Sequence, residues 1–257
     1  MTSPHETITA FPPGDYVSSG YARIWADPFF PNMVAGERDR SDWPHLRREI
    51  PHNWYVDRRQ PTVGFVSRDE AHILYNTARR YPGIPALEIG CWLGWSACHL
   101  ALGGVTLDVI DPLLGLPDIY ASVSGSLSQA GISDRVTLVP GVSPARVLEL
   151  AGLHRRGWNL FFIDGNHEPP GPLDDAKAVA ACAPADALVL FHDLASPAVA
   201  EGLALLRARG WKTMLYQTMQ IMGVAWRGSA QPVAHVPDPA VPWTIPDHLR
   251  SWPVCGS

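Results

Sequence analysis

Polar residues end several apolar runs of this sequence, and their types suit acid–base and metal chemistry. Residues 105–111 (VTLDVID) and 158–165 (WNLFFIDG) are two such runs. Near-continuous apolar runs are typical of parallel strands that are buried on both faces. In an open α/β sheet, ligands bind beyond the carboxyl ends of the strands. We therefore expect six side chains to gather at one rim: Glu88, Asp111, Asp164, His167, His192 and Asp193.

A glycine-containing turn joins the first of these strands to a helix. In residues 86–101 (ALEIGCWLGWSACHLA), Glu88 precedes Gly90 and Gly94, and Ser96 begins a run of small residues. Glycine has no Cβ, so the backbone of such a turn can approach a ligand closely. The helix beyond the turn offers free N–H groups. A dinucleotide fingerprint would need G-x-G-x-x-G, and Trp92 stands where its second glycine should be.

Strands and helices alternate along the middle of the chain. The run Ser67-Arg68-Asp69-Glu70 is a capping box, and apolar residues at helical spacing follow it as far as residue 80. This alternation predicts an α/β fold: a Rossmann-like, doubly wound, mostly parallel seven-stranded sheet with helices on both faces. The last two strands are expected to form an antiparallel hairpin. The predicted later strands span residues 135–140, 187–191, 211–216 and 219–226.

The two ends of the chain differ from this central part. Residues 1–66 form an arm rich in Pro, Trp and Arg, residues 67–228 form the predicted domain, and residues 229–257 form a Pro-rich tail. We expect the arm to cap the domain or to pack on a partner subunit, so a homo-oligomer, most simply a two-fold dimer, is predicted. Four side chains of the arm are able either to cap a ringed or anionic substrate or to pack as core: Trp43, Trp54, Arg58 and Arg59.

Composition limits the partners and the compartment. The formal net charge of −5 argues against nucleic acid as a partner. The four cysteines form no C-x-x-C pair, which indicates neither a zinc knuckle nor a disulfide framework. The sequence shows no secretory signal and no apolar run of about 20 residues, the length that crosses a membrane. We expect a cytoplasmic protein without a membrane partner.

These motifs resemble a known family. Residues 86–101 resemble motif I of the class I S-adenosylmethionine-dependent methyltransferases, whose loop wraps the methionine part of the cofactor. The runs FIDGNH (residues 162–167) and LVLFHD (residues 188–193) resemble the small-molecule O-methyltransferase branch of that family. That branch includes macrocin-type, cephalosporin-pathway and catechol-type enzymes, which often depend on Mg²⁺. The resemblance covers about residues 67–228.

The resemblance implies S-adenosylmethionine as cofactor. Asp111 would bind the two ribose hydroxyls, and Glu88 would lie near the methionine amino group or brace the loop. Ser143 would touch the adenine or only cap the helix that follows it. The implied cofactor-binding residues are Glu88, Gly90, Gly94, Ser96, Asp111, Ser143 and Asp164.

The resemblance also implies a divalent metal, usually Mg²⁺. Asp164 and Asp193 match its ligands, and His192 occupies the remaining ligand position. An oxygen ligand is usual there, because Mg²⁺ prefers oxygen whereas imidazole suits Zn, Fe or Ni. This departure leaves a second possibility open, a metal-free site in which the two acids bind polar groups of the substrate.

A general base is implied three residues after Asp164. In the catechol-type enzymes that position is usually lysine, and here it is His167. Histidine suits proton transfer, since its unperturbed pKa is about 6.5. The predicted catalytic residues are therefore His167, Asp164 and His192, with His192 as the rival base if no metal binds it. His167 would otherwise only hydrogen-bond the loop.

The predicted function is methyl transfer to a hydroxyl group, rather than to an amine or a carbon, of a small molecule. A natural-product or sugar intermediate is the expected acceptor. Two alternatives stay open, a Rossmann-type NAD(P)-binding oxidoreductase and a methyltransferase-like binding module without turnover.

Overall fold

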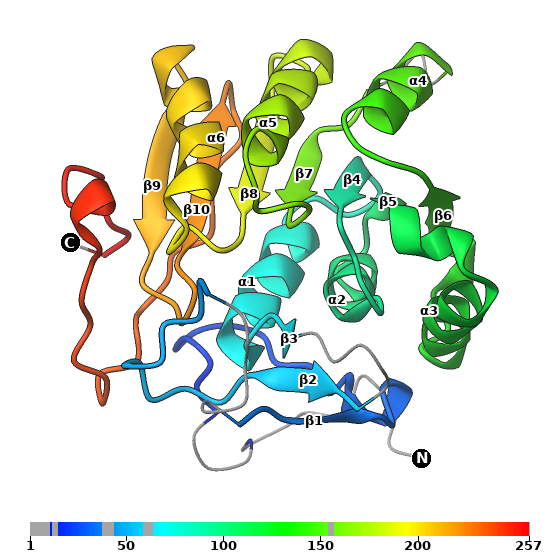
Figure 1. Ribbon diagram of the computed structural model, residues 1–257, viewed down its shortest axis with the longest axis horizontal. Coiled ribbons are helices and arrows are strands. Elements are labelled where there is room, and N and C mark those ends of the chain that lie inside the picture. The colour runs from blue at the N-terminus through cyan, green and yellow to red at the C-terminus, as the bar shows by residue number, and fades with distance from the viewer. Residues whose placement is uncertain (1–10, 12–14, 38–43, 59–63, 154–156, 257) are drawn as a thin grey trace.

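A seven-stranded sheet forms the centre of the computed structural model, which describes residues 11, 15–37, 44–58, 64–153 and 157–256 (Figure 1). The strand order is β6-β5-β4-β7-β8-β10-β9, and β10 runs antiparallel to both of its neighbours while the other pairs are parallel. The predicted doubly wound sheet with a terminal hairpin is confirmed. The strands are β4 (Pro85–Ile89), β5 (Thr106–Asp111), β6 (Val136–Pro140), β7 (Leu160–Ile163), β8 (Ala187–Phe191), β9 (Lys212–Tyr216) and β10 (Met222–Arg227).

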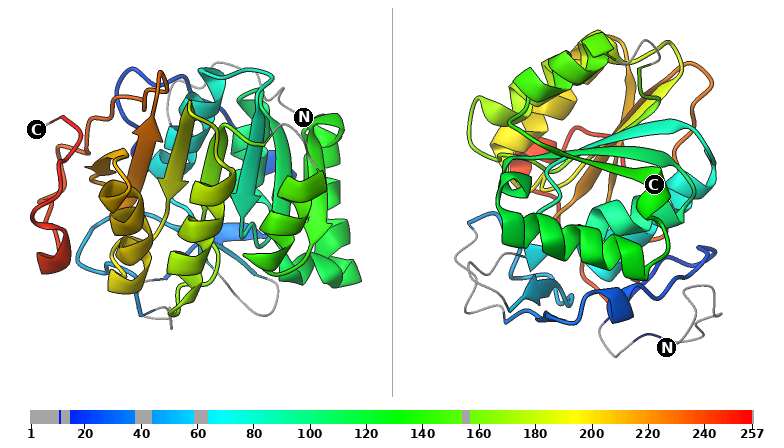
Figure 2. Two further views of the ribbon diagram at one scale, coloured as in Figure 1. Left: turned by 90° about the horizontal axis from the view of Figure 1, so that it is seen from above. Right: turned by 90° about the vertical axis from the view of Figure 1, so that its right-hand side faces the viewer.

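Helices cover both faces of this sheet (Figure 2). One face carries α1 (Arg68–Arg79), α2 (Trp95–Leu102) and α3 (Pro117–Gln129), and the other carries α4 (Ala145–Leu153), α5 (Gly171–Cys182) and α6 (Pro197–Ala208). Strand β7 shows why its sequence is continuously apolar. Leu160 and Phe162 belong to the core under α1 and α2, whereas Phe161 and Ile163 belong to the core under α5 and α6. Both faces of the strand are buried, as expected of a central parallel strand.

The capping box predicted at the start of α1 is present. The Glu70 backbone N–H donates to Ser67 Oγ at 3.3 Å, and the Ser67 backbone N–H donates to Glu70 Oε2 at 2.8 Å. All three residues of this first turn, Arg68, Asp69 and Glu70, are buried. A first turn that faced water would leave these charges exposed, so other parts of the chain must cover it.

The arm is one of the parts that cover α1. Three short strands, β1 (Met33–Ala35), β2 (Tyr55–Asp57) and β3 (Gly64–Phe65), form a separate antiparallel sheet that lies below α1 and α2 in Figure 1. Buried Arg68 of α1 pairs with two acids of the arm, Asp15 at 2.7 Å and Asp27 at 2.8 Å. The arm therefore packs on its own domain, and its small sheet was not predicted from the sequence.

The side chains proposed from the arm have different positions. Trp54 is buried against Leu46 and Met219, which makes it core rather than a substrate cap. Arg58 is exposed. Trp43 and Arg59 lie outside the described residues.

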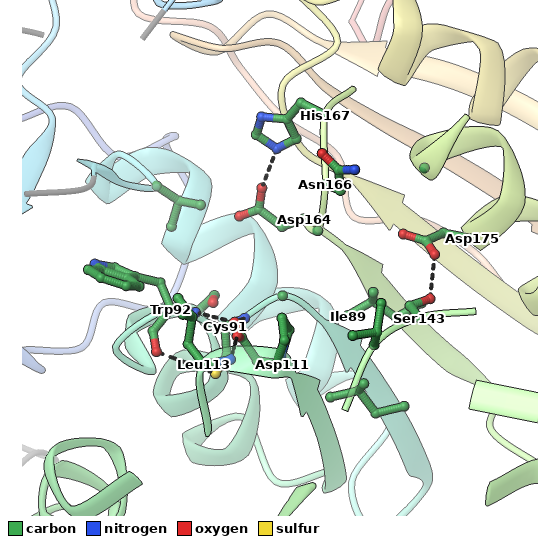
Figure 3. A pocket seen from close by; sticks show the side chains of 18 of the residues that line it. Ile89, Cys91, Trp92, Asp111, Leu113, Ser143, Asp164, Asn166, His167 and Asp175 are labelled. Atoms are coloured by element: carbon green, nitrogen blue, oxygen red, sulfur yellow. Dashed lines mark hydrogen bonds and ion pairs between the residues drawn. The ribbon is translucent and has the colours of Figure 1, made fainter. Parts of the chain in front are cut away.

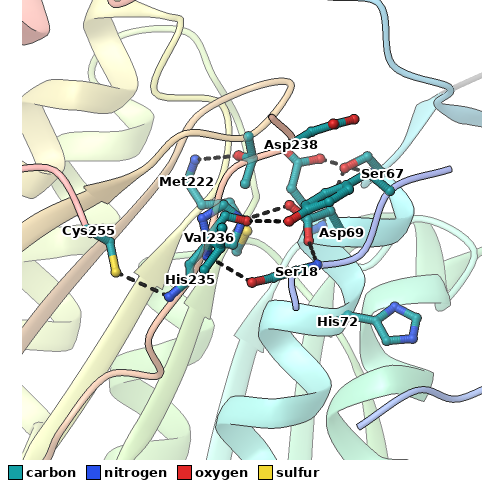
Figure 4. A network of polar contacts seen from close by, with 12 residues as sticks. Ser18, Ser67, Asp69, His72, Met222, His235, Val236, Asp238 and Cys255 are labelled. Atoms are coloured by element: carbon teal, nitrogen blue, oxygen red, sulfur yellow. Dashed lines mark hydrogen bonds and ion pairs between the residues drawn. The ribbon is translucent and has the colours of Figure 1, made fainter. Parts of the chain in front are cut away.

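The tail is the second part that covers α1. His235 Nε2 lies 2.7 Å from Asp69 Oδ2, and the backbone N–H of Ser18 donates to Asp69 Oδ1 at 2.8 Å (Figure 4). The end of the tail returns to the sheet, where the Cys255 N–H donates to the Leu215 carbonyl at 2.8 Å. Asp69 thus joins the arm, α1 and the tail at one buried point.

Four short 3-10 helices complete the described chain: η1 (Asp27–Phe29), η3 (Pro112–Gly115), η4 (Ser133–Arg135) and η5 (Asp247–Leu249). None of the described helices is long and apolar enough to cross a membrane.

Replacing Asp69 by alanine is expected to destabilise the protein. The change leaves the Ser18 N–H and the His235 ring buried without their acceptor, which costs about 3 kcal/mol of unfolding free energy. The measurement is urea unfolding followed by tryptophan fluorescence. Asp247→Ala is the matched control, because Asp247 pairs with Arg250 at the surface and such pairs contribute less than about 1 kcal/mol. Equal losses in the two variants would contradict the structural role of Asp69.

Candidate functional site

A cavity of about 480 Å³ opens at the carboxyl ends of the central strands (Figure 3). Its walls come from the glycine turn after β4 (residues 89–92), the segment after β5 (residues 110–113), Val142 and Ser143 after β6, and residues 164–167 after β7. Residues 64–66 of the arm close another side. The cavity lies where the strand order changes direction, between β4 and β7, which is the usual ligand position in an open α/β sheet.

The glycine turn packs directly against the end of β7. Gly90 has a φ of +84°, and a Cβ at this position would lie 2.2 Å from the carbonyl oxygen of Asp164. Only glycine fits such an approach. Gly94 has a φ of +86° at the start of α2, where a Cβ would lie 2.9 Å from Val123 Cγ1. Gly94 is not a lining residue of the cavity, so it shapes the turn from behind.

Glu88 lies beneath the turn rather than in the cavity. It is fully buried and accepts a hydrogen bond from the Ser96 hydroxyl. Burial, with Asp164 and Asp111 nearby, raises the pKa of Glu88 well above its usual value. Of the two predicted positions for Glu88, this geometry corresponds to the loop brace. Ser96 lines the cavity, but its hydroxyl points inward to Glu88.

Asp111 holds the glycine turn in place while it lines the cavity. Its Oδ2 accepts the backbone N–H groups of Cys91 and Trp92, each at 2.9 Å, and its Oδ1 accepts that of Leu113 at 2.8 Å. A carboxylate has about four acceptor positions. One position therefore remains for a ligand hydroxyl in this arrangement, whereas the sequence prediction assigned Asp111 both hydroxyls of a diol.

Ser143 makes a contact that the sequence did not predict. Its hydroxyl donates to Asp175 Oδ1, and α4 begins two residues later at Ala145. Asp175 comes from α5, lines the cavity and is buried, and burial raises its pKa to about 6. In Figure 3 this pair lies at one side of the cavity, and Trp92 lies at the other.

Two acids and two histidines meet beside the cavity, which Asp164 and His167 line. His167 Nε2 lies 3.4 Å from Asp164 Oδ1 and 3.2 Å from Asp193 Oδ2. His192 Nδ1 lies 3.4 Å from the same Asp164 oxygen and 2.8 Å from the same Asp193 oxygen. The sequence prediction placed six strand-end side chains at one rim, and four of them lie together here.

The two histidines differ in their access to the cavity. His167 lines it, whereas His192 is 3% exposed and is not a lining residue. Burial alone would lower the pKa of His192, but Asp193 and Asp164 raise it well above its usual value. The same two acids raise the pKa of His167 against the effect of burial. Burial would raise the pKa of Asp164, and His192 followed by His167 instead lower it below its usual range.

The cluster fits a divalent cation. One ligand atom each from Asp164, His167 and Asp193 lie within 4.8 Å of one another. Asp193 is fully buried, and its Oδ1 accepts no hydrogen bond from the described residues. A cation between the two acids would stabilise this buried carboxylate in addition to the two histidines that face its Oδ2. The closest trio contains His167 where the sequence prediction had His192, although His192 Nδ1 faces the same two carboxylates.

The backbone of Asp193 is also unusual. Its φ is +55°, a conformation that residues other than glycine adopt infrequently and that aspartate tolerates better than most. Such conformations persist where the surrounding structure over-determines them, often at functional sites.

Two residues near the cluster were missed in the sequence. The ring of His45, from the arm, lies edge-on to that of His167 with a centroid separation of 5.9 Å. Glu70 of α1 lies 3.3 Å from the second nitrogen of His192. His45 stands in a segment without periodicity, and the capping box already explained Glu70, so neither carried a signal for this site.

Comparison with known proteins shows similarity in one segment of the sequence and in the fold. Residues 87–194 match the family model described as a methyltransferase domain. An O-methyltransferase from Bacillus cereus in complex with SAH has a similar fold, with a TM-score of 0.56 and 13% identity over 63% of this chain and 83% of that chain. The O-methyltransferase TomG from Streptomyces achromogenes, involved in tomaymycin synthesis and solved with SAM, has a TM-score of 0.53. Its sequence identity is 18%, over 64% of this chain and 82% of that chain.

The matched segment runs from β4 to the end of β8 and so includes the glycine turn, Asp111 and the acid–histidine cluster. Residues 87–194 are thus similar to a methyltransferase domain, and the fold is similar to that of solved O-methyltransferases.

Proposed function

We propose that this protein transfers a methyl group from S-adenosylmethionine to a hydroxyl group of a small molecule. The observation that carries the proposal is a single cavity that runs from the Asp111-braced glycine turn to the acid–histidine cluster. The solved neighbours bound to SAH or SAM support the choice of cofactor. A natural-product or sugar intermediate is the proposed class of acceptor.

Methyl transfer requires a nucleophilic oxygen in line with the sulfonium methyl group. Asp111 and the backbone of the glycine turn would bind and orient the cofactor. His167 faces the cavity and would take the proton of the acceptor hydroxyl, a role that contributes about 10²–10⁴-fold in rate. His192 is buried behind the acids, so it is not placed to meet the acceptor.

A divalent ion would be held by Asp164, His192 and Asp193, with His167 adjacent. When bound, such an ion acts as a Lewis acid that makes a coordinated hydroxyl more acidic. The imidazole in the donor set favours Mn²⁺ or a later transition metal beside Mg²⁺.

Calorimetric titration with S-adenosylmethionine and with NAD tests the proposal directly. Binding of S-adenosylmethionine, and release of S-adenosylhomocysteine in the presence of hydroxylated aromatic or sugar acceptors, are the expected results. Binding of NAD alone would favour the oxidoreductase alternative. Tight cofactor binding without turnover on any acceptor would favour the binding module.

Asp111→Ala is expected to weaken S-adenosylmethionine binding. The variant removes a charged acceptor worth about 1.5–3 kcal/mol and releases the N–H groups of Cys91 and Trp92. This corresponds to a rise in the dissociation constant of about 10- to 150-fold, measured by calorimetry. Asp108→Asn is the matched control, since Asp108 is on the same strand but bonds to Trp158 Nε1 outside the cavity. Unchanged affinity in Asp111→Ala would show that the cofactor lies elsewhere.

The proposed assembly is a homodimer. Leu116 and Tyr120 are large apolar side chains that stay exposed, and exposed apolar side chains suit contact with a second copy of the chain. Light scattering at micromolar concentration is expected to give twice the monomer mass. A monomer mass would contradict the proposal.

A further inference from the structure

Glu70 is buried more deeply than its capping role requires. The contact with the Ser67 N–H is the one that a capping-box glutamate makes, and it needs only one carboxylate oxygen. A glutamate at the protein surface would serve equally well. Glu70 is instead 0% exposed, and a buried carboxylate costs free energy unless donors or charges compensate for it. Its burial therefore points to a second role.

Its other contacts connect α1 to the functional site. Oε1 accepts the Gln220 backbone N–H at 2.9 Å, in the turn between β9 and β10, and Oε2 lies 3.3 Å from His192 Nε2. Burial alone would raise the pKa of Glu70, but His192, followed by the Gln220 and Ser67 N–H groups, lowers it to about 2. Glu70 thus connects the turn at Gln220 with Nε2 of the His192 ring through its two carboxylate oxygens.

The other ring nitrogen of His192, Nδ1, faces Asp164 and Asp193. His192 Nδ1 lies 2.8 Å from Asp193 Oδ2 and 3.4 Å from Asp164 Oδ1. A histidine that ligates a metal generally gives its other ring N–H to a carboxylate, which fixes both the tautomer and the orientation of the ring. The same arrangement occurs here, because Glu70 lies at one ring nitrogen of His192 and the two acids lie at the other.

We propose that Glu70 is the positioning residue for His192. Its carboxylate engages Nε2, so that Nδ1 is presented to a divalent ion between Asp164 and Asp193. Glu70 acts through His192 and does not line the cavity. Glu70 stands in the first turn of α1, shortly after arm residues 64–66, which line the cavity. Glu70 therefore also connects the end of the arm with the proposed metal site. The inference rests on the metal site of the proposed function.

A double-mutant cycle in Mn²⁺ affinity tests this coupling. The affinity is measured by electron paramagnetic resonance of free Mn²⁺ for the parent, Glu70→Gln, His192→Ala and the double variant. Glu70→Gln is expected to weaken Mn²⁺ binding about 10- to 100-fold in the parent background. In the His192→Ala background it should change the affinity by no more than about twofold, because its partner is gone. The ligand-field spectrum of bound Co²⁺ should shift in Glu70→Gln.

Ser67→Ala is the matched control. It removes the other half of the same capping box and leaves the Glu70–His192 contact, so it should lower the melting temperature while Mn²⁺ affinity stays at the parental value. If Glu70→Gln does not fold, Glu70→Asp replaces it, since the shorter side chain withdraws the charge from His192. Three results overturn the proposal: parental Mn²⁺ affinity in the Glu70 variant, equal weakening in Ser67→Ala, or additive effects in the double variant.

The parent protein distinguishes the two proposals. If the parent binds neither Mn²⁺ nor Co²⁺, the metal site and the role of Glu70 are both overturned, while methyl transfer from S-adenosylmethionine is judged by its own assay. If the parent binds Mn²⁺ and the Glu70 variant binds it with the same affinity, the metal site stands but Glu70 does not position His192.

Discussion

Exhaustive chelation is expected to reduce methyl transfer by at least about two orders of magnitude, since a metal-polarised oxygen contributes several kcal/mol to the transition state. The physical reason lies in the charge of the cluster. Asp193 is fully buried and one of its oxygens accepts no hydrogen bond from the described residues, so a cation between the acids would add to the charge that the two histidines supply at its other oxygen. Added Mn²⁺ or Mg²⁺ should restore the rate, and the order of effectiveness reports how strongly the imidazole ligands select the metal. The measurement is the initial rate of S-adenosylhomocysteine release after dialysis against chelator.

Asp193→Asn separates loss of the metal from loss of the fold. Asparagine also tolerates a φ of +55°, so the backbone at this position should keep its conformation. The variant keeps the shape of the side chain but removes its charge, and it should need a much higher Mn²⁺ concentration for activity. Cofactor affinity should stay parental, because Asp193 does not line the cavity. Full activity of the parent after chelation would instead favour the metal-free site, in which the acids bind the acceptor directly.

The central fold could be predicted because its signals are local. Strand β7 reads as a continuous apolar run since both of its faces are buried, and Ser67 and Glu70 cap α1 through residues three positions apart. The sheet of the arm gave no such signal. Its strands are two or three residues long, and β1 pairs with β2 across a long connection, as in the pair Met33 and Asp57. Pairing at that separation depends on the completed fold and not on a local pattern.

For the candidate site, the positions of the side chains at the strand ends could be predicted, but their contacts could not. Asp111 and Asp164 end strands, and their position relative to the rim follows from the parallel sheet alone. Their hydrogen-bond partners do not follow from the strand order, because they depend on the conformation of the glycine turn after β4. Asp111 uses three acceptor positions for backbone N–H groups, and Glu88 turns away from the cavity to Ser96. Glu70 was explained by its cap, and only the packing of α1 against the ends of β8 and β10 shows its second contact.

His167→Gln and His167→Ala are each expected to lower turnover by about two orders of magnitude or more, close to 3 kcal/mol in the barrier. His167 is the histidine of the cluster that lines the cavity, and its Nε2 lies within 3.4 Å of Asp164 and 3.2 Å of Asp193. These acids would hold the ring in place and stabilise the imidazolium that forms when it accepts the acceptor's proton. S-adenosylmethionine affinity should be unchanged. Single-turnover rates, together with calorimetry of cofactor binding, measure the two effects separately.

The pH dependence provides the second half of this test. A general base acts only when it is neutral, and the neighbouring acids raise the pKa of His167 in the absence of an ion. The parental rate should therefore rise with pH through the titration of this histidine, and the rise should be missing in His167→Gln. His45→Gln is the matched control, because that imidazole contacts the His167 ring from the arm without lining the cavity, so its variant should keep the rising limb. Near-parental turnover in both His167 variants would refute the assignment. A loss of Mn²⁺ affinity equal to the loss of rate would show instead that His167 serves as the metal ligand that its place in the closest trio permits.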